Sequence, residues 1–254
     1  HAARPPSLVM SAVVASPSRS ASRVFPPTRR PCGAARYSRR PRSVADLPDQ
    51  PADDSQPLKD PVVKLTGERP MEGHTPDSLL ALHHAGYREV IARLGAGRTL
   101  DVGCGVGMET ARFCGPDRRV VGVDYDAATA GLARSDFGPG GPGGTDVEFV
   151  AMDGASLGFA TASFDSVCSS HIIEHFVMPE NHVAELARVC ADDGPAFVMT
   201  PNQTADFENP FHVYLFHAVQ PAPLLRPFFQ GREINRPADA AMPLTALTHA
   251  RPRG

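Results

Sequence analysis

The sequence predicts an α/β fold, with a parallel sheet and helices on both of its faces. Between residues 98 and 200, short apolar runs alternate with runs whose apolar residues recur at helical spacing. A glycine-rich turn follows the first of these strands, and aspartates stand at or near the ends of the first three. Strands that alternate with helices form parallel sheets with right-handed crossovers, and such sheets bind ligands at the carboxyl ends of their strands.

The order of the elements follows from hydrophobic periodicity and from turn residues. Five strands are expected, at residues 98–103, 119–124, 146–153, 164–170 and 195–200. Three helices are expected between them, at residues 107–114, 126–135 and 179–190. The stretch GPGGPGG (138–144) can only be a loop, because glycine and proline interrupt both kinds of element.

A further helix is expected before the first strand. Thr75 is the predicted N-cap, Pro76 opens the first turn, and Gly95 ends the helix. One face of this helix should carry the residues that recur at helical spacing, namely Leu79, His83, Tyr87, Val90, Ile91 and Leu94.

The chain divides by composition into three parts. Residues 1–62 contain eleven prolines mixed with Ser, Arg and Ala, and we expect a disordered or targeting segment there. The folded domain is expected at residues 63–235, followed by a tail at 236–254. A length of 254 residues suffices for one α/β domain or for two small ones.

Three interpretations of residues 1–62 remain open. Residues 1–45 hold nine arginines, eight serines and no acidic residue, which is typical of organellar transit peptides. The apolar run LVMSAVVA, from Leu8 to Ala15, is alternatively the core of a secretory signal. The third interpretation is an ordinary disordered tail, or sequence outside the true coding frame, since the first residue is His and not Met. The location is therefore expected to be cytoplasmic, or organellar if the segment is a transit peptide.

Charge, hydropathy and cysteine content restrict the class of protein. Outside residues 1–45 the chain carries 16 basic and 28 acidic residues, a formal net charge of −12, which disfavours nucleic acid as a partner. No run of eighteen apolar residues exists, so no membrane span is expected. The five cysteines are scattered without a CxxC pair, which favours a reducing compartment and gives no sign of a metal site.

The glycine loop after the first strand predicts a nucleotide site. Gly103, Gly105 and Gly107 let the backbone turn sharply and approach a ligand closely, but Met108 breaks the dinucleotide pattern GxGxxG. Asp101 lies just before the loop. A carboxylate ~5 Å from a pyrophosphate charge costs about 3 kcal/mol at an effective dielectric of ~20. The aspartate thus favours a cationic ligand such as S-adenosylmethionine.

Two further aspartates extend the expected site. Asp124 ends the second strand, where a carboxylate can accept both hydroxyl groups of a ribose. Asp153 and Gly154 end the third strand, where the carboxylate can accept a hydrogen bond from an adenine amino group. Each acid alone has a simpler explanation, because Asp124 could cap the next helix and Asp153 a turn. Together with the glycine loop they predict a nucleoside site.

Four stretches give the chain a resemblance to a known family. LDVGCGVG (100–107), VVGVDYD (120–126) and residues 151–175 and 185–202 resemble successive motifs of class I S-adenosylmethionine-dependent methyltransferases, most closely the type-11 group that acts on small molecules and lipids. The resemblance covers about residues 75 to 216. It implies a Rossmann-like sheet, with S-adenosylmethionine as cofactor and a small molecule as methyl acceptor.

The resemblance also implies roles for individual residues. Asp101 and the loop from Gly103 through Cys104 and Gly105 to Gly107 would hold the methionine part of the cofactor. Asp124 would bind the ribose, with Tyr125 beside the adenine and with Asp153 and Gly154 facing the adenine ring.

The chain departs from the family pattern in two places. The family usually has PGG before its fifth strand, where this sequence has DDGP (192–195). Residues 223–234 suit a helix and a sixth strand, but residues 236–254 do not resemble the family's seventh strand. We therefore expect the C-terminal strand to be missing or altered, which would leave an exposed sheet edge.

Histidines are the candidates for a catalytic base. His171 and His175 follow the fourth strand, and a histidine there can take a proton at neutral pH if the acceptor is a hydroxyl. Their spacing of four residues would place both on one helical face. His171 is the expected base. His175 is expected on the substrate side, and with Glu174 it does not match the metal motif HExxH.

Two residues after the fifth strand are expected on the substrate side. Asn202 and His212 are polar and should border the acceptor pocket. The segment Asn209-Pro210-Phe211-His212 resembles one in methyltransferases of surface polysaccharide pathways, so the acceptor of an O- or N-directed transfer could be a sugar or a lipid.

Two other functions stay open from the sequence alone. One is a non-catalytic or degenerate methyltransferase-like domain, suggested by the irregular C-terminus. The other is an NAD(P) oxidoreductase, which Asp101 and Met108 disfavour. Neither the acceptor nor the oligomeric state follows from the sequence.

Overall fold

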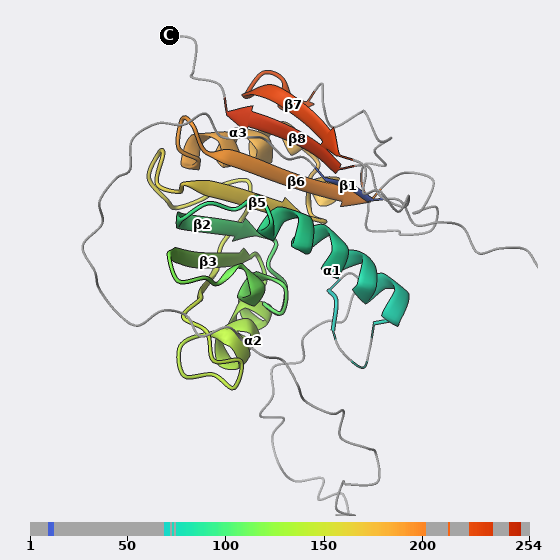
Figure 1. The fold of residues 1–254 in the computed structure, drawn as a ribbon, viewed down its shortest axis with the longest axis vertical. Coiled ribbons are helices and arrows are strands. Elements are labelled where there is room, and N and C mark those ends of the chain that lie inside the picture. Colours follow the sequence, from blue (N-terminus) through green and yellow to red (C-terminus); the bar gives the residue numbers. More distant parts are fainter. Residues whose placement is uncertain are drawn as a thin grey trace, which may run out of the picture.

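The structure is a computed structural model that describes residues 10–12, 69–71, 73, 75–201, 213, 224–235 and 244–249. In these ranges the chain forms an eight-stranded sheet with the order β4-β3-β2-β5-β6-β1-β8-β7. In the view of Figure 1, helix α1 (Asp77–Ile91) lies in front of this sheet and α3 (Pro179–Val189) lies behind it. Helices on both faces confirm the predicted α/β class.

Five parallel strands form the centre of the sheet. They are β2 (Gly97–Val102), β3 (Arg118–Asp124), β4 (Glu148–Ala151), β5 (Ser166–Ser170) and β6 (Pro195–Pro201). Their order β4-β3-β2-β5-β6 is 3-2-1-4-5 in chain sequence, and all four neighbouring pairs are parallel. All five lie within one to two residues of the predicted bounds, so the alternation of apolar runs was a sound guide to this region.

The C-terminal strand that the sequence was expected to lack is present. Strands β7 (Phe229–Asn235) and β8 (Leu244–His249) form an antiparallel hairpin, and β8 also pairs antiparallel with β6. The expectation that residues 236–254 contain no strand is therefore wrong. Short segments take the strand state from their neighbours more than from their own propensity, and β8 has a partner on each side.

A strand that the sequence did not predict extends the same edge. Strand β1 (Met10–Ala12) pairs antiparallel with residues 199–201 of β6, while β8 pairs with residues 195–197. The two strands thus share one edge of β6 along its length. These three residues fall inside the segment 1–62 that was expected to be non-globular.

Helix α1 begins differently from the prediction. Its N-cap is Pro76, which makes no side-chain capping bond, and the hydroxyl of Thr75 instead accepts a hydrogen bond of 2.9 Å from the backbone N–H of Met71. The helix ends at Ile91, four residues before Gly95. Thr75 is thus not a helix cap but fastens the chain segment that precedes the helix.

The helix predicted at residues 107–114 is only a short 3-10 helix, η2 (Thr110–Phe113). Gly107 has a φ of +85°, a left-handed conformation that cannot belong to a right-handed helix. The single turn that remains places Phe113 in the core with no exposed surface. The next predicted helix is present as α2 (Ala127–Phe137), which packs against β3 and β4.

The core lies on both faces of the parallel strands. Its largest fully buried side chains include Phe113, Phe149, Phe164, Phe197 and Leu100. The predicted inner face of α1 is buried at Tyr87, Val90 and Leu94 and half-buried at Ile91. Among the helices in the described part of the chain, none combines the length and apolarity needed to cross a bilayer.

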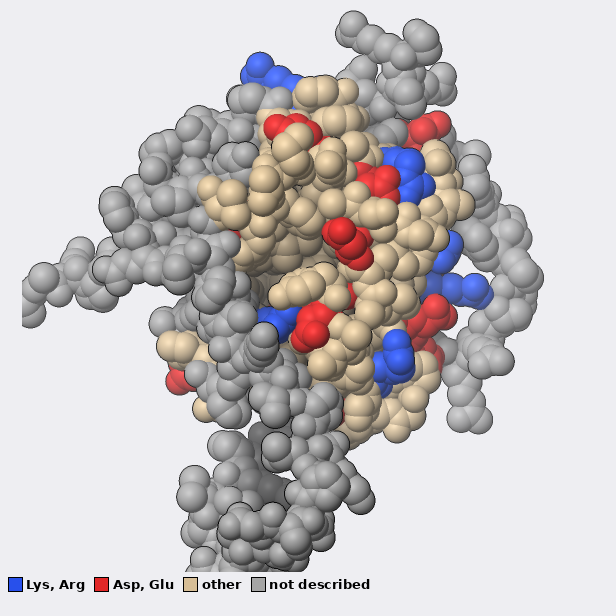
Figure 2. Space-filling model, turned by 180° about the vertical axis from the view of Figure 1, so that it is seen from behind, with Lys and Arg blue, Asp and Glu red and all other residues tan. Residues whose placement is uncertain are grey.

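Charged side chains of both signs are mixed on one face of the molecule (Figure 2). On the face shown in Figure 2, the basic side chains are scattered among acidic ones and form no continuous patch. Nucleic-acid binding needs a basic stripe or patch, so the described residues of this face offer no such footprint.

Candidate functional site

A cavity of about 690 Å³ opens where β2, β3, β4 and β5 end. Cofactor and ligand pockets of globular proteins have volumes of about 300–1,000 Å³, so a nucleoside cofactor fits in size. The residues that line it come from the chain before α1, from α1, and from the loops after the four strands. They are Arg69, Pro70, His83, Tyr87, Val102, Gly103, Cys104, Gly105, Val106, Met108, Glu109, Val123, Asp124, Tyr125, Met152, Asp153, Gly154, Ser170, His171, Ile172, His175 and Phe176.

The glycine loop forms the floor of this cavity. Gly103, Gly105 and Gly107 have φ values of +85°, +53° and +85°, which L side chains rarely adopt. A Cβ at Gly103 would collide with Ile172, and one at Gly107 would lie 2.8 Å from the ring of Phe149. At Gly105 a Cβ would meet only Arg69, at 3.9 Å, so the loop packs tightly at both ends and is open in its middle.

Asp101 lies behind the cavity wall and not in it. Its carboxylate has no exposed surface and accepts hydrogen bonds from the hydroxyls of Thr110, at 2.6 Å, and Tyr87, at 3.2 Å. Burial raises the pKa of Asp101 to about 6, although those two hydrogen bonds oppose the rise. Tyr87, which lines the cavity, therefore stands between Asp101 and any ligand. A direct contact of Asp101 with the cofactor stays a prediction.

Asp124 stands at the end of β3 with its carboxylate at the cavity. The carboxylate accepts hydrogen bonds from the backbone N–H groups of Gly105, at 3.1 Å, and Asp126, at 3.0 Å, and pairs with Arg69 at 3.3 Å. The cap of α2 is Asp126, whose side chain accepts from the N–H groups of the first helical turn. The simpler explanation of Asp124 as a helix cap is therefore wrong. The adjacent Tyr125 has 76 % of its surface exposed.

Asp153 and Gly154 form the opposite wall, just after β4. Asp153 accepts a hydrogen bond of 2.8 Å from the N–H of Ala155, which makes the simple turn contact that the sequence allowed. Gly154 is buried, and its carbonyl lies 2.9 Å from Nδ1 of His182. Both residues line the cavity, and their contact with an adenine ring stays a prediction.

His182 holds this wall in place, although no motif in the sequence pointed to it. It lies in α3 without exposed surface, with its Nε2 atom 2.8 Å from the hydroxyl of Ser169 in β5. Its ring stacks on Phe176, with centroids 4.5 Å apart. Burial lowers the pKa of His182 to about 4, so the ring is neutral and joins three separate segments.

His171 and His175 both line the cavity, but they do not share a helical face. The segment after β5 is a 3-10 helix, η3 (Ile173–His175), and His171 precedes it with a φ of +54°. Its backbone N–H donates to the carbonyl of Met199 in β6, at 2.9 Å. A non-glycine residue in this conformation carries strain, which is concentrated at functional sites in proteins. The predicted helical geometry is wrong, whereas the predicted roles of His171 as base and of His175 on the substrate side stay predictions.

A buried carboxylate and a second histidine flank His171. Its Nδ1 atom lies 3.9 Å from Oε1 of Glu174, which is 1 % exposed and accepts a 3.0 Å hydrogen bond from Thr200. The ring of His83, from α1, lies 4.2 Å from the His171 ring between centroids. Burial lowers the pKa of His83 to about 4, with a contribution from His84, so His83 is neutral at pH 7.

His83 and Tyr87 are site residues that helical spacing alone assigned to the core. Both belong to the buried face of α1, and both also line the cavity. A period of four residues cannot distinguish a side chain that meets other side chains from one that meets a ligand. Asn202 and His212, the other two predicted substrate-side residues, lie outside the described residues. Within the described part, no three His, Cys, Asp or Glu side chains cluster as a metal site would require.

The architecture and the site define a class of protein. A 3-2-1-4-5 parallel sheet followed by an antiparallel pair, with a glycine loop and strand-end aspartates around one cavity, is the arrangement of a class I S-adenosylmethionine-dependent methyltransferase. Residues 100–198 match the family profile described as "Methyltransferase domain", the type-11 group. Residues 100–198 of the chain therefore belong to this family.

Relatives with curated names share this region. A probable S-adenosylmethionine-dependent methyltransferase of Mycolicibacterium smegmatis is 31 % identical over 168 residues, which is 63 % of this chain and 63 % of that protein. The O-methyltransferase cnsE of Penicillium expansum is 35 % identical over 106 residues, covering 40 % and 38 % of the two chains. A ubiquinone biosynthesis O-methyltransferase of Sinorhizobium fredii is 29 % identical over 107 residues, or 42 % of each chain. The chain thus matches less than two thirds of the length of these relatives.

Solved structures share the fold. The YcgJ protein from Bacillus subtilis superposes with a TM-score of 0.54 at 24 % identity, covering 61 % of this chain and 71 % of that one. A putative methyltransferase from Bacillus halodurans gives a TM-score of 0.51 at 23 % identity, covering 60 % and 71 %. At this identity the likeness concerns the fold alone.

Proposed function

We propose that this protein transfers a methyl group from S-adenosylmethionine to an oxygen atom of a small molecule. The observation that carries the proposal is the pairing of an open glycine floor at Gly105 with the buried Asp124 carboxylate 3.1 Å from its N–H. Gly105 leaves room for a ligand to lie against the backbone, and Asp124 offers an acceptor to ribose hydroxyls. Bound S-adenosylmethionine supplies an activated methyl group, so the protein need only position the acceptor and exclude water.

The cofactor residues follow from the walls of the cavity. Gly103, Cys104 and Gly105 would lie under the methionine part, with Gly107 outside the lining and packed against Phe149, and Asp124 would hold the ribose. Tyr125, Asp153 and Gly154 would border the adenine, each from a loop that lines the cavity. The nearby but buried Asp101 would favour the ligand's positive charge from behind the ring of Tyr87.

His171 is the proposed general base. It lines the cavity with its backbone fixed by β6 and with the Glu174 carboxylate 3.9 Å from its Nδ1 atom. A neighbouring carboxylate stabilises a protonated imidazole, as required of a base that has taken a hydroxyl proton. His83, which is kept neutral by burial, can lie beside that imidazolium without repelling it. We place His175, Asn202 and His212 on the acceptor side.

Two lines of support favour oxygen as the acceptor atom. Among the relatives, cnsE and the ubiquinone biosynthesis enzyme are O-methyltransferases by name. A histidine base is useful only when the acceptor must lose a proton, as a hydroxyl or phenol does. The non-catalytic alternative loses its motivation, because β7 and β8 fill the edge that was expected to be empty.

Calorimetry with S-adenosylhomocysteine tests the cofactor part of the proposal. We expect binding in the micromolar range, with Asp124→Ala weakening it at least about tenfold, equivalent to the loss of a charge-assisted hydrogen bond. Methyl transfer is then followed by mass spectrometry over a panel of phenols, sugars and lipid hydroxyls. Folded protein that binds neither S-adenosylmethionine nor S-adenosylhomocysteine would contradict the proposal.

A further inference from the structure

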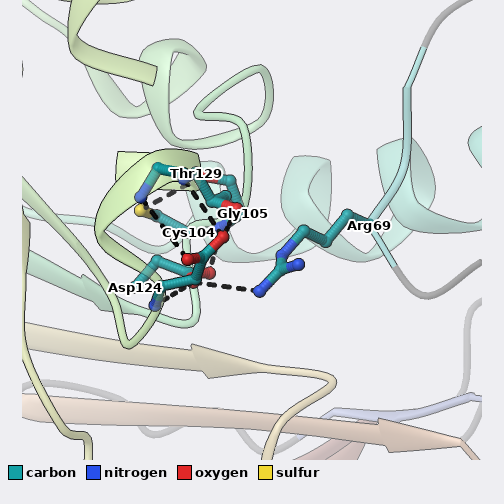
Figure 3. A network of polar contacts seen from close by, with 7 residues as sticks. Arg69, Cys104, Gly105, Asp124 and Thr129 are labelled. Atoms are coloured by element: carbon teal, nitrogen blue, oxygen red, sulfur yellow. Dashed lines mark hydrogen bonds and ion pairs between the residues drawn. The ribbon is translucent and has the colours of Figure 1, made fainter. Parts of the chain in front are cut away.

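Arg69 occupies the part of the cavity that the proposed function gives to the cofactor. Its Nη2 atom lies 3.3 Å from Oδ1 of Asp124, and its guanidinium lies 5.4 Å from the centroid of the Tyr125 ring. Its Cγ atom lies 3.9 Å from the position that a Cβ at Gly105 would take, in the open middle of the glycine loop. Figure 3 shows the side chain reaching from the segment before α1 to the Asp124 carboxylate at the end of β3.

The backbone that presents Arg69 is fastened to the start of α1. The N–H of Thr75 donates to the carbonyl of Met71 at 2.9 Å, and the Thr75 hydroxyl accepts from the N–H of Met71 at 2.9 Å. Only 10 % of the Arg69 side chain is exposed. The chain beside Arg69 is therefore anchored to the start of α1, and the mostly buried guanidinium lies in the cavity.

Charge makes Arg69 distinctive among the residues that line the cavity. Within the described residues it is the sole Lys or Arg in the lining, which also contains Glu109, Asp124 and Asp153. Glu109 already has basic neighbours, since it pairs with His84 and with Arg112. A ligand that carries both a carboxylate and a ribose would therefore meet one guanidinium in the described lining. That guanidinium is paired with Asp124, the residue proposed to accept hydrogen bonds from the ribose.

We propose that Arg69 exchanges partners when the cofactor binds, leaving Asp124 to the ribose and pairing with the α-carboxylate of the cofactor's methionine part. This inference rests on the proposed function. Oδ1 of Asp124 already accepts hydrogen bonds from Arg69 and from the N–H of Asp126, so it can accept a ribose hydroxyl only after Arg69 has left it. A guanidinium gives a carboxylate two parallel hydrogen bonds, which is a better pairing than its single 3.3 Å contact with Asp124.

The exchange predicts opposite effects on two ligands. S-adenosylhomocysteine carries both a ribose and an α-carboxylate, so Arg69 competes with it at one end and binds it at the other. 5′-Methylthioadenosine carries the same nucleoside without the amino-acid part, so Arg69 only competes with it. Removing the guanidinium should thus weaken the first ligand and strengthen the second.

Calorimetry on the full chain and on Arg69→Ala tests the exchange. We expect S-adenosylhomocysteine to bind at least about tenfold more weakly to the variant and 5′-methylthioadenosine to bind about twofold to tenfold more tightly. Arg93→Ala is the matched control, because Arg93 also lies near an end of α1 but pairs with Glu89 away from the cavity. Binding of 5′-methylthioadenosine also reports that the variant's site is folded.

The outcomes separate this inference from the proposed function. If the unmodified chain binds both ligands and Arg69→Ala changes both in the same direction, or neither, the exchange is wrong and the proposed function stands. If the unmodified chain binds neither ligand, the proposed function and the exchange fail together. Opposite changes in the two affinities support the exchange.

Discussion

The two halves of the cavity are built in different ways. The half that we assign to the cofactor is made of backbone turns and strand ends: the glycine loop after β2, Asp124 at the end of β3 and Gly154 after β4. The half that we assign to the acceptor is made of side chains brought together from distant segments, with His83 from α1 and His171 from the loop after β5. The first half depends on conformations that only certain residue types allow, and the second depends on packing.

This difference explains why one half follows from a local pattern and the other does not. A left-handed turn favours glycine, and three glycines at every second position are easily recognised, so the loop can be identified within the short stretch 100–107. The contact between His83 and His171 joins distant parts of the sequence, so no local sequence pattern predicts it. The acceptor half is also where relatives with the same fold can differ in substrate, since side chains change there without disturbing the sheet.

The largest effect should come from His171 in the acceptor half. We expect His171→Ala to lower kcat by about 10²–10⁴-fold and to leave the affinity for S-adenosylhomocysteine unchanged, because a positioned base contributes only when the acceptor loses a proton. Turnover and calorimetry measure the two quantities. His175→Ala should lower kcat less than about tenfold, since the Glu174 carboxylate and the His83 ring lie beside the imidazole of His171. Full activity of His171→Ala would remove His171 from the chemistry.

The second-largest effect, on folding stability, is expected at Gly103, where the two halves of the cavity meet. A methyl group there would collide with Ile172 of the acceptor half, and the φ of +85° disfavours any side chain. We expect Gly103→Ala to lower the free energy of unfolding by about 2–5 kcal/mol, from left-handed strain and overpacking together. Urea denaturation measures the change.

Two other glycines supply the comparison for Gly103. Gly105→Ala carries the strain without the collision, so it should cost about 1–2 kcal/mol of stability and weaken cofactor binding. Gly95→Ala has open space around the new methyl group and no left-handed φ, and it should leave stability within about 1 kcal/mol of the original. Equal losses at Gly103 and Gly105 would mean that Ile172 yields and the halves are not tightly joined.

The limits of the sequence prediction follow the same division. The five parallel strands and Asp124 could be predicted because their signals are local. Strand β8 could not, because its stability comes from pairing with β6 and β7 on both sides. The 3-10 helix η2 escaped prediction because its apolar spacing suits a longer helix, whereas the left-handed backbone at Gly107 and the extended backbone at Cys114 leave room only for a short one.

Three residues of the site gave signals that pointed elsewhere. His83 and Tyr87 share the spacing of core residues on α1. His182 lies within an α3 pattern whose apolar neighbours, Val183 and Leu186, indicate a buried face and nothing more. A buried histidine needs hydrogen-bond partners, and this need is what distinguishes His182 from its apolar neighbours. The partners, Ser169 and Gly154, are distant in sequence and are identified only in the structure.

His182 offers a smaller, pH-dependent effect. Replacing it in His182→Phe keeps a ring for Phe176 to stack on but leaves the Ser169 hydroxyl and the Gly154 carbonyl without their partner. We expect a loss of about 1–3 kcal/mol of unfolding free energy at pH 7, the cost of unsatisfied buried polar groups. Thermal or urea unfolding measures it.

The pH dependence of folding stability shows whether His182 acts as a hydrogen-bonding group or only as a packed ring. The pKa of His182 is about 4 in the folded protein, against 6.5 for a histidine exposed to water, so the unfolded chain binds the proton first. The contribution of His182 to folding stability is therefore lost as pH falls from about 6.5 to 4, and His83 adds a loss in the same window. Asp101, whose pKa is raised to about 6 by burial, opposes both losses below about pH 6. His182→Phe should flatten this part of the stability curve, leaving the contribution of His83. An unchanged slope would assign the acid sensitivity to other groups.

The smallest effect concerns Thr75, which holds the Arg69 segment to α1. Thr75→Ala removes the acceptor of the 2.9 Å bond from Met71 and should cost about 0.5–1.5 kcal/mol of stability, because one partly buried hydrogen bond is lost. Thr75→Ser keeps the hydroxyl and is the matched control. The segment before α1 carries Arg69, the only guanidinium in the described cavity lining. Thr75→Ala should therefore also weaken S-adenosylhomocysteine binding, by about twofold to threefold, which is less than the effect of Arg69→Ala. If Thr75→Ala acted on stability alone, Arg69 would be placed by its contacts with Asp124 and Tyr125 and the turn before α1 would contribute nothing to the cofactor half.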